Sequence, residues 1–471
     1  MKRRFFFATV FVMAILLPLS AQSFGFGFDD EAETSYSTGF APSVTISGEV
    51  SASLMGYVHD FTKGINKVEL GNIFSGKLNF SAGVSFADAF ISLKLKPFET
   101  SSVIIAPPDT KLTFSTSPVS IDEAYVRAFF GGFEVEGGLR KLSWGKADSF
   151  GPLDVVNPLD YSELTDLSSM LNFKIARPMV HLSYRFGSFS KIEAVFVPWF
   201  EPLRYDMEGR WIPAQMEQLK DQLAVQASGI PFDITINKPN ASLYYAQAGI
   251  RFTTSIGPAD IGIQYYYGRL TRPALPTVTT VPTMPPVPPT PPLPSKLDFF
   301  IDFAYNPYHQ IGIDWAQVLF GFNIRAEFAV NITEDLKGDD GGVYNPHLAW
   351  ALGFDRNLFW GINLNLQCNE TVRLMHNKIT SPLDTEAGSD MTSTQIIAAI
   401  SKTFLNDQLE LRVAAFWEIE AKDFMIIPSL IWTKDAVTVE LSGGIFGGDK
   451  AGQFGQYWEN SFVKVALKYS F

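Results

Sequence analysis

Apolar and polar residues alternate one by one along most of this chain, and this pattern constrains the fold more than any other feature. Between Val44 and Leu54 the even positions are Val, Ile, Gly, Val, Ala and Leu, whereas the odd positions from 43 to 53 are Ser, Thr, Ser, Glu, Ser and Ser. Residues 324–330 and 360–366 alternate in the same way. Because successive side chains of a β-strand point to opposite faces, the pattern predicts an all-β fold whose strands each have an apolar and a polar face.

The alternation continues too far for one soluble sheet sandwich, which closes its core within roughly 100 to 250 residues. We count about 19 candidate strands separated by Gly, Pro, Asn and Asp. Bacterial transmembrane barrels have an even number of strands, so one of these predictions should be wrong and we expect about 18 strands, within about 16–20. The candidate ranges are 43–58, 68–82, 88–97, 119–130, 133–143, 177–186, 190–199, 243–253, 258–268, 297–305, 308–316, 318–330, 348–355, 360–370, 394–403, 408–418, 424–433, 436–446 and 461–471.

Composition excludes several classes of protein. Charged residues make up 18% of the chain, below the value of about 25% for soluble domains, while apolar residues reach 46%, which excludes disorder. Cys368 is the single cysteine, so no intramolecular disulfide forms. The net charge of −12 argues against nucleic acid as a partner, because phosphates require a basic surface.

The N-terminus has the form of an export signal. Lys2, Arg3 and Arg4 precede an apolar run from Phe5 to Leu17, and small residues end at Ala21. This run is shorter than the roughly 20 apolar residues that a membrane helix needs. We therefore expect a signal peptide at 1–21, a short periplasmic segment at 22–42 and a barrel at 43–471.

The last strand supports a barrel in the outer membrane of a diderm bacterium. Apolar residues stand at every second position from Val463 onward, opposite Lys464 and Lys468. Hydrocarbon offers no partner for a backbone amide, so strands that cross a membrane must close on themselves. A terminal aromatic residue resembles the signal that barrel-assembly machinery recognises, and the residues predicted to form this signal are Leu467, Tyr469 and Phe471.

Three long connections interrupt the strands, and the N-terminal segment has no room for a plug domain. The segment 143–176 is a candidate for an inward-folded loop. The segment 201–242 contains a helical pattern at 213–227, expected either as a lid in the mouth or packed against a neighbouring loop. The proline-rich segment 271–296 is expected to be an extended, polyproline-like surface loop without internal hydrogen bonds.

The first connection carries a family resemblance. The run Gly138, Leu139, Arg140, Lys141, Leu142, Ser143, Trp144, Gly145, Lys146, Ala147 and Asp148 is followed by Asp154, Val155, Val156, Asn157, Pro158, Leu159 and Asp160. This arrangement resembles an uncharacterised family of bacterial outer-membrane porin-like proteins, in which an Arg strand leads to a Trp-Gly pair, an Asp and an Asn-Pro-x-Asp turn. The resemblance implies a porin-like barrel but indicates little about the substrate.

The polar parity of the strands predicts which residues line the lumen. Alternating acidic and basic residues on 119–130 and 133–143 predict a charged ladder that either sorts solutes or simply neutralises itself. The acidic series in the first connection, which includes Asp166, has a spacing compatible with calcium, but it matches no standard calcium loop and a hydrogen-bonded turn is the better interpretation. The predicted pore-lining residues are Glu123, Arg127, Glu134, Glu136, Arg140, Trp144, Asp148, Asp154, Asn157, Asp160, Arg325, Glu327, Asn363, Asn365 and Gln367.

These features predict a channel rather than an enzyme. The sequence has no G-x-S-x-G elbow, phosphate loop or H-E-x-x-H motif, and we expect no cofactor and no metal. The expected function is passive entry of small solutes into the periplasm. The alternative is a gated channel for hydrophobic compounds, with a lumen blocked by the loop. A third hypothesis is a surface adhesin or antigen whose barrel only displays its loops. Membrane lipids, the assembly machinery and a small solute are the expected partners, and a homo-oligomeric state is left open.

Overall fold

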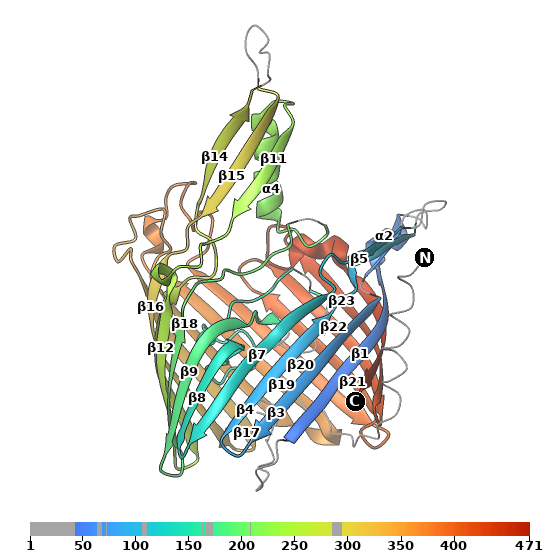
Figure 1. Ribbon diagram of the computed structural model, residues 1–471, viewed down its shortest axis with the longest axis vertical. Coiled ribbons are helices and arrows are strands. Elements are labelled where there is room, and N and C mark those ends of the chain that lie inside the picture. Colours follow the sequence, from blue (N-terminus) through green and yellow to red (C-terminus); the bar gives the residue numbers. More distant parts are fainter. Residues whose placement is uncertain are drawn as a thin grey trace.

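In the computed structural model, the chain forms a closed barrel of 18 antiparallel strands (Figure 1). The structure describes residues 43–63, 68–71, 73–105, 111–162, 164–165, 173–207, 209–284 and 294–471. The predicted signal peptide and periplasmic segment, 1–42, lie outside the described residues.

Each barrel strand pairs with its two neighbours, and β24 pairs with β1 from Glu49↔Ser470 to Tyr57↔Phe462, which closes the ring. The ring therefore leaves no free edge. In ring order the barrel strands are β1 (Ser43–Tyr57), β3 (Phe74–Val84), β4 (Ala87–Leu95), β7 (Val119–Phe130), β8 (Phe133–Arg140), β9 (Arg177–Phe186), β10 (Ser190–Val197), β12 (Gln247–Ile256), β13 (Ala259–Arg269), β16 (Pro307–Leu319), β17 (Phe322–Thr333), β18 (His347–Asn357), β19 (Ile362–Arg373), β20 (Thr392–Phe404), β21 (Leu409–Glu418), β22 (Asp423–Lys434), β23 (Val437–Gly448) and β24 (Phe462–Ser470).

The two faces of the strands differ as the alternation predicts. On β24, Val463, Val465 and Leu467 are 50%, 49% and 52% exposed, whereas the intervening Ala466 is 1% exposed. The same alternation on β17 exposes Phe328 and buries Glu327. Lipid would contact the outward apolar side chains, and the polar ones face the lumen.

The two ends of the barrel differ in the length of their connections. Tight turns such as 187–189 and 257–258 join strands at one end, with Gly187 and Gly257 at φ of 61° and 60°, a backbone conformation that glycine adopts without strain. Long loops join the strands at the other end. In bacterial outer-membrane barrels the short turns face the periplasm and the long loops face outward, so we assign the ends accordingly.

The final strand ends in a paired position. The backbone N–H of Phe471 donates to the carbonyl oxygen of Gly48 at 2.9 Å, and the N–H of Gly48 donates back to Phe471 at 2.8 Å. The terminal residue therefore takes part in closing the ring.

All but one of the candidate strand ranges fall on barrel strands. The exception is 297–305, which is a strand, β15 (Lys296–Phe303), but lies outside the barrel. It forms a three-stranded sheet with the parallel β11 (Phe232–Asn237) and the antiparallel β14 (Pro276–Thr283). This sheet and helix α4 (Ala214–Ala227) stand above the long-loop end of the barrel (Figure 1), and we call them the appendage.

The appendage has its own core, which explains the wrong assignment. Leu297, Phe299 and Ile301 alternate as in a barrel strand, but they pack against Leu223 and Ala227 of α4 rather than facing lipid. The predicted helix at 213–227 therefore forms, and it packs against strands from another loop rather than acting as a lid in the barrel mouth.

The prediction of an unpaired polyproline segment at 271–296 is wrong for part of its length. Residues 276–283 form β14, which pairs with β15 from Pro276↔Phe303 to Thr283↔Lys296. The prolines at 276 and 282 flank the run Thr277–Val281, whose β-branched residues favour a strand and retain their N–H groups. Residues 285–293 lie outside the described residues.

The remaining elements lie in the other connections. Most of them are short strands and helices in the loops at the long-loop end. One, a short 3-10 helix, lies in the short connection between β18 and β19 at the other end. They are α2 (Val58–Thr62), β2 (Val68–Leu70), β5 (Phe98–Ile105), β6 (Lys111–Phe114), η2 (Leu243–Tyr245), η3 (Phe359–Gly361), η4 (His376–Lys378) and η5 (Gly455–Asn460).

Candidate functional site

The described part of the loop between β8 and β9 lies against lumen-facing side chains of β12 to β19. Its anchor is Glu327 on β17, which is 3% exposed. The carboxylate accepts backbone N–H groups of Lys146, of Ala147 at 2.6 Å and of Leu153 at 3.1 Å. One barrel carboxylate thus holds both ends of the segment 146–153, which we call the latch segment.

Glycine allows the latch segment to approach the wall this closely. A Cβ atom at Gly151 would lie 2.7 Å from Oε2 of Glu327, and one at Gly145 would overlap Oε1. Gly145 also has φ of 96°, which side chains other than hydrogen disfavour. The Trp-Gly pair quoted above therefore has a steric reason in this chain.

Asp148 provides a second anchor on neighbouring strands. Its carboxylate accepts from Nη2 of Arg325 at 2.5 Å and from Nδ2 of Asn365 at 2.7 Å. Its backbone N–H donates to Oε1 of Gln367 at 2.8 Å. Arg325 also pairs with Asp355 at 2.6 Å. The structure therefore brings Asp148, which was predicted on a loop that could fold into the pore, together with Arg325, Asn365 and Gln367 on the strands.

Two glutamines that sequence reasoning missed complete this contact. Gln264 donates to the carbonyl oxygen of Leu153 at 2.9 Å, and Gln310 donates to that of Pro152 at 2.9 Å. Leu153 itself is 0% exposed and packs with Ala329. Both glutamines stand at lumen-facing positions of β13 and β16, so the signal that identified Gln367 also applied to them.

The other predicted residues of the loop stabilise its own shape. Trp144 is buried and packs edge-on against Tyr266, with ring centroids 6.3 Å apart. Asn157 accepts from the N–H of Leu142 at 2.8 Å and donates to the carbonyl oxygens of Arg140 at 2.9 Å and Ile175 at 2.8 Å. Asn157 therefore joins the two ends of the loop where they leave the barrel wall.

The acidic residues in the described part of the loop do not converge on one point. Asp154 pairs with Lys174 at 2.7 Å, whereas Asp160 pairs with Arg204 at 3.0 Å. Asp166 lies outside the described residues. Within the described ranges, no group of three or more His, Cys, Asp or Glu side chains could hold a metal ion. These carboxylates act as hydrogen-bonded and ion-paired turn residues.

A large apolar cluster connects the loop to the opposite part of the ring. Phe150 packs against Phe416 of β21, with centroids 5.9 Å apart, and Phe173 joins the same cluster. Sequence reasoning missed the barrel side of this cluster, although β20 to β24 have apolar residues at both parities. We call these lumen-facing residues the apolar wall: Ile397, Phe416, Met425, Phe446 and Phe462.

The predicted charged ladder lies on β4 and β7 to β10. Arg127 pairs with Asp88 at 2.9 Å and lies 3.9 Å from Glu134, while Arg140 pairs with Glu136 at 3.0 Å. Further contacts extend the ladder through residues that sequence reasoning missed: His181 lies 2.7 Å from Glu136 and 3.3 Å from Glu193, and Lys191 pairs with Glu193 at 3.1 Å. Acidic and basic side chains thus alternate across five neighbouring strands.

Two predicted residues play other parts. The carboxylate of Glu123 accepts the backbone N–H of Lys141 at 2.9 Å, where the loop leaves β8. Asn363 donates to Asn357 at 3.0 Å beside a short turn, so it is not among the residues that hold the latch segment.

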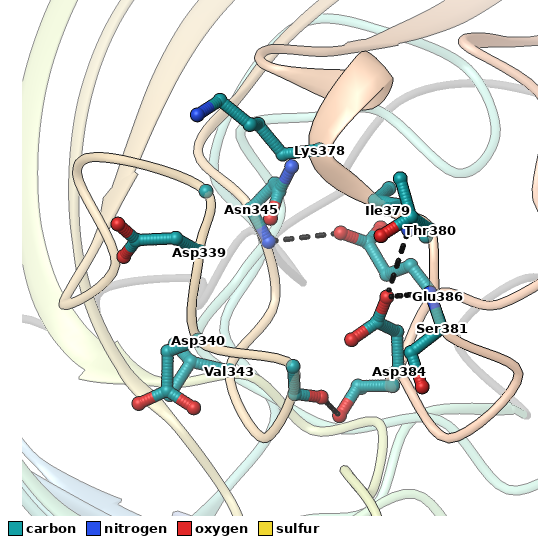
Figure 2. Close-up of a pocket in the computed structure, with 13 residues that line it drawn as sticks. Asp339, Asp340, Val343, Asn345, Lys378, Ile379, Thr380, Ser381, Asp384 and Glu386 are labelled. Carbon is teal, nitrogen blue, oxygen red and sulfur yellow. Dashed lines mark hydrogen bonds between the residues drawn. The ribbon is translucent and has the colours of Figure 1, made fainter.

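A separate cavity lies at the long-loop end between the connections 334–346 and 374–391. Figure 2 shows this cavity, which has a volume of about 200 Å³ and an acidic lining that includes Asp339, Asp340 and Asp384. Asn345 donates its N–H to Glu386 at 2.8 Å, which ties the two loops together. The cavity belongs to the rim rather than to the lumen site.

A buried carboxylate shapes the first of these rim loops. Asp335 accepts backbone N–H groups of Gly338 at 2.9 Å and Asp340 at 2.9 Å. Burial acts to raise the pKa of Asp335, but these and neighbouring backbone N–H groups outweigh it and hold the pKa below its ordinary value of 3.8. The loop is therefore organised around an ionised aspartate.

The closed ring, its lipid-compatible exterior and its polar lumen define a porin-like β-barrel protein of the outer membrane. The chain belongs to the family described as "Protein of unknown function (DUF1302)", which matches residues 57–471. No curated protein sequence matches the chain with significance. Among the described residues, no helix is long and apolar enough to cross a membrane.

Several solved structures resemble the chain at low sequence identity. Acinetobacter baumannii OccAB4 is 9% identical, with a TM-score of 0.47, covering 91% of this chain and 98% of that one. Pseudomonas aeruginosa OccK11 is 10% identical, with a TM-score of 0.46, covering 91% and 96%. Wzi of Escherichia coli, a carbohydrate-binding β-barrel involved in group 1 capsule assembly, is 9% identical, with a TM-score of 0.45, covering 90% and 84%.

Proposed function

We propose that this protein is a passive outer-membrane channel for small solutes, and that the loop 143–176 sets the width of its passage. The observation that carries the proposal is the attachment of the latch segment to Glu327 inside a closed barrel. A loop held to the wall by a buried carboxylate and by Asp148 narrows the lumen without sealing the barrel as a separate plug domain would. Solutes then pass between this loop and the remaining wall, driven by their own gradient, and no catalytic step is involved.

Ion conductance in planar bilayers tests this proposal. Purified, folded protein should insert and give stable current steps that scale with the conductivity of the bathing salt, because a water-filled passage conducts in proportion to it. A denatured sample of the same protein is the control for detergent artefacts. Protein that inserts in its folded form and passes no current would refute the proposal.

A second function, a gated channel for apolar compounds, is favoured by the apolar wall. In a general diffusion channel the lumen is polar, whereas here Phe416, Met425 and Phe446 face inward and are covered by loop residues such as Phe150. An apolar compound would compete with the loop for this wall. Saturable uptake of a fluorescent fatty acid by proteoliposomes that show no ion current would favour this function over the first.

A further inference from the structure

A cluster of lysines lies on the wall of the barrel opposite the latch segment. The latch segment contacts β17 and β19. The same number of strands separates β4 from β18 in either direction around the ring, so β3, β4 and β7 face β17 to β19 across the lumen (Figure 1). If the proposed function holds, a solute passes between these two sides.

A β-bulge creates the centre of this cluster. The pairing of β4 with β7 shifts between Ser92 and Leu93, so that β7 has one extra residue there. As a result Asp122 and Glu123, which are adjacent in sequence, both point inward, whereas Ile121 is 58% exposed on the outer face. Bulges re-aim side chains, and they occur preferentially near functional sites.

Three lysines from different parts of the wall converge on the one carboxylate of Asp122. Nζ of Lys141 lies 2.6 Å from Asp122, Nζ of Lys94 lies 2.9 Å away and Nζ of Lys77 lies 3.4 Å away. The side chains of Lys141 and Asp122 are 4% and 5% exposed, so they form a buried pair. Those of Lys77 and Lys94 are 33% and 30% exposed, so both side chains remain partly accessible.

The charges of this cluster do not balance. Lys77 and Lys94 are direct cross-strand partners, an arrangement in which like charges repel. Lys77, Lys94 and Lys141 all contact the one carboxylate of Asp122, and Glu49 is the cross-strand neighbour of Lys77 on β1. The ammonium groups that contact Asp122 therefore outnumber the carboxylate that they share.

Each ammonium group has three N–H donors, and the contact with Asp122 uses one donor of each lysine. Lys77 and Lys94 thus retain donors for an anion in the lumen, while the buried pair of Lys141 and Asp122 fixes their position. Carboxylates and phosphates are the ligands that such paired ammonium groups bind.

We propose that Lys77 and Lys94 form an anion-binding site in the lumen, so that the channel favours small anionic solutes such as carboxylates or phosphates. This inference rests on the proposed channel function. The site would bind an anion weakly, because Asp122 already neutralises part of the charge of Lys77 and Lys94. Weak binding suits passage through a channel, since a solute must also leave the site.

Two measurements test the site, and the second does not require a conducting channel. In the first, the zero-current potential in a potassium chloride gradient gives the ratio of chloride to potassium permeability. The wild type should prefer chloride, and the K77Q/K94Q variant should lower this ratio about threefold to tenfold, the range expected for two charges that line a narrow passage. The matched control is K191Q, because Lys191 is also 30% exposed but pairs with Glu193 on its own strand and does not contact Asp122. Cation preference in the wild type, or an equal fall in K191Q, would overturn the site.

The second measurement does not depend on current. Broadening of the ³⁵Cl NMR line by the folded protein in detergent reports weak chloride binding, and K77Q/K94Q should reduce it while K191Q should not. Displacement by acetate or by inorganic phosphate then identifies the preferred anion. Broadening that is the same in wild type and K77Q/K94Q overturns the site even if the channel conducts. Broadening that K77Q/K94Q removes supports the site even if bilayers remain silent, a result that would refute only the channel. The single variant K94Q serves if the double variant fails to show the heat-dependent gel shift of a folded barrel.

Discussion

Replacing Glu327 by Ala should release the latch segment from the barrel wall. The carboxylate accepts backbone N–H groups of Lys146, Ala147 and Leu153, so the variant leaves three buried donors without their acceptor. The Asp148 anchor on Arg325 and Asn365 remains, so the loop keeps part of its attachment.

The size of the effect follows from these contacts. Leaving a buried N–H group without its acceptor costs about 1–3 kcal/mol per donor. Water that enters the vacated space recovers part of this loss for the three donors. We therefore take the free energy that attaches the latch segment to the wall to be weakened by about 3 kcal/mol. Since each 1.4 kcal/mol is a factor of ten, the ratio of released to attached loop should rise on the order of 100-fold.

Single-channel recording measures this change. Wild-type channels should give a steady current, whereas E327A channels should fluctuate between the wild-type level and larger levels, because a released loop no longer narrows the passage. The control is E440A, since Glu440 also faces the lumen but lies on β23 and pairs with Lys468 at 3.6 Å. Folding is checked by the heat-dependent gel shift. The role assigned to the latch segment would be refuted if folded E327A gave currents as steady as those of the wild type, or if E440A fluctuated as much as E327A.

Three further predictions concern the ladder, the last residue and the rim. Reversing Arg127 and Arg140 to Glu should raise the preference for cations, because four charge units change on the lumen wall; unchanged reversal potentials would contradict their contact with the passage. F471A should lower the amount of assembled barrel in cells several-fold. Refolding in detergent should change much less, because the hydrogen bonds with Gly48 use backbone atoms and the lost side-chain contact is the stacking of the ring on Tyr469. Equal assembly would remove the terminal aromatic from the recognition signal. Because the pKa of Asp335 is lowered on folding, its stabilising effect is complete above its ordinary pKa of 3.8 and is lost as the pH falls through the lower folded value. Limited proteolysis at 334–346 should therefore increase in acid, and D335N should show the same cleavage at neutral pH; a D335N loop as resistant as the wild type would refute this.

The barrel could be predicted from sequence because its determinant is local. Period-two alternation decides which face of a strand meets lipid, and it placed the terminal residues Val463 to Leu467 correctly. The pattern failed at 297–305 because Leu297, Phe299 and Ile301 alternate in the same way over a helix as they would against lipid. Alternation identifies a strand with one apolar and one polar face, but it does not show whether lipid or protein covers the apolar face.

The attachment of the loop could not be predicted, because its partners are distant in sequence. Asn369 donates to the carbonyl oxygen of Ser149, 220 positions away. Parity identified Glu327 and Gln367 as lumen-facing, yet it cannot show that both contact one segment of the loop. The apolar wall was missed for a related reason. Phe416 and Phe446 break the polar parity, and the aromatic rings that cover them, Phe150 and Trp211, lie far away in the sequence.

Liposome swelling with a graded series of sugars, amino acids and aromatic acids tests the central claim, a water-filled passage narrowed by its own loop, most directly. The account predicts swelling that is fast for the smallest solutes, falls steeply with solute size, and becomes less dependent on size in E327A. Proteoliposomes that contain folded wild-type protein and do not swell with the smallest solute, or that swell equally with every solute tested, would contradict it.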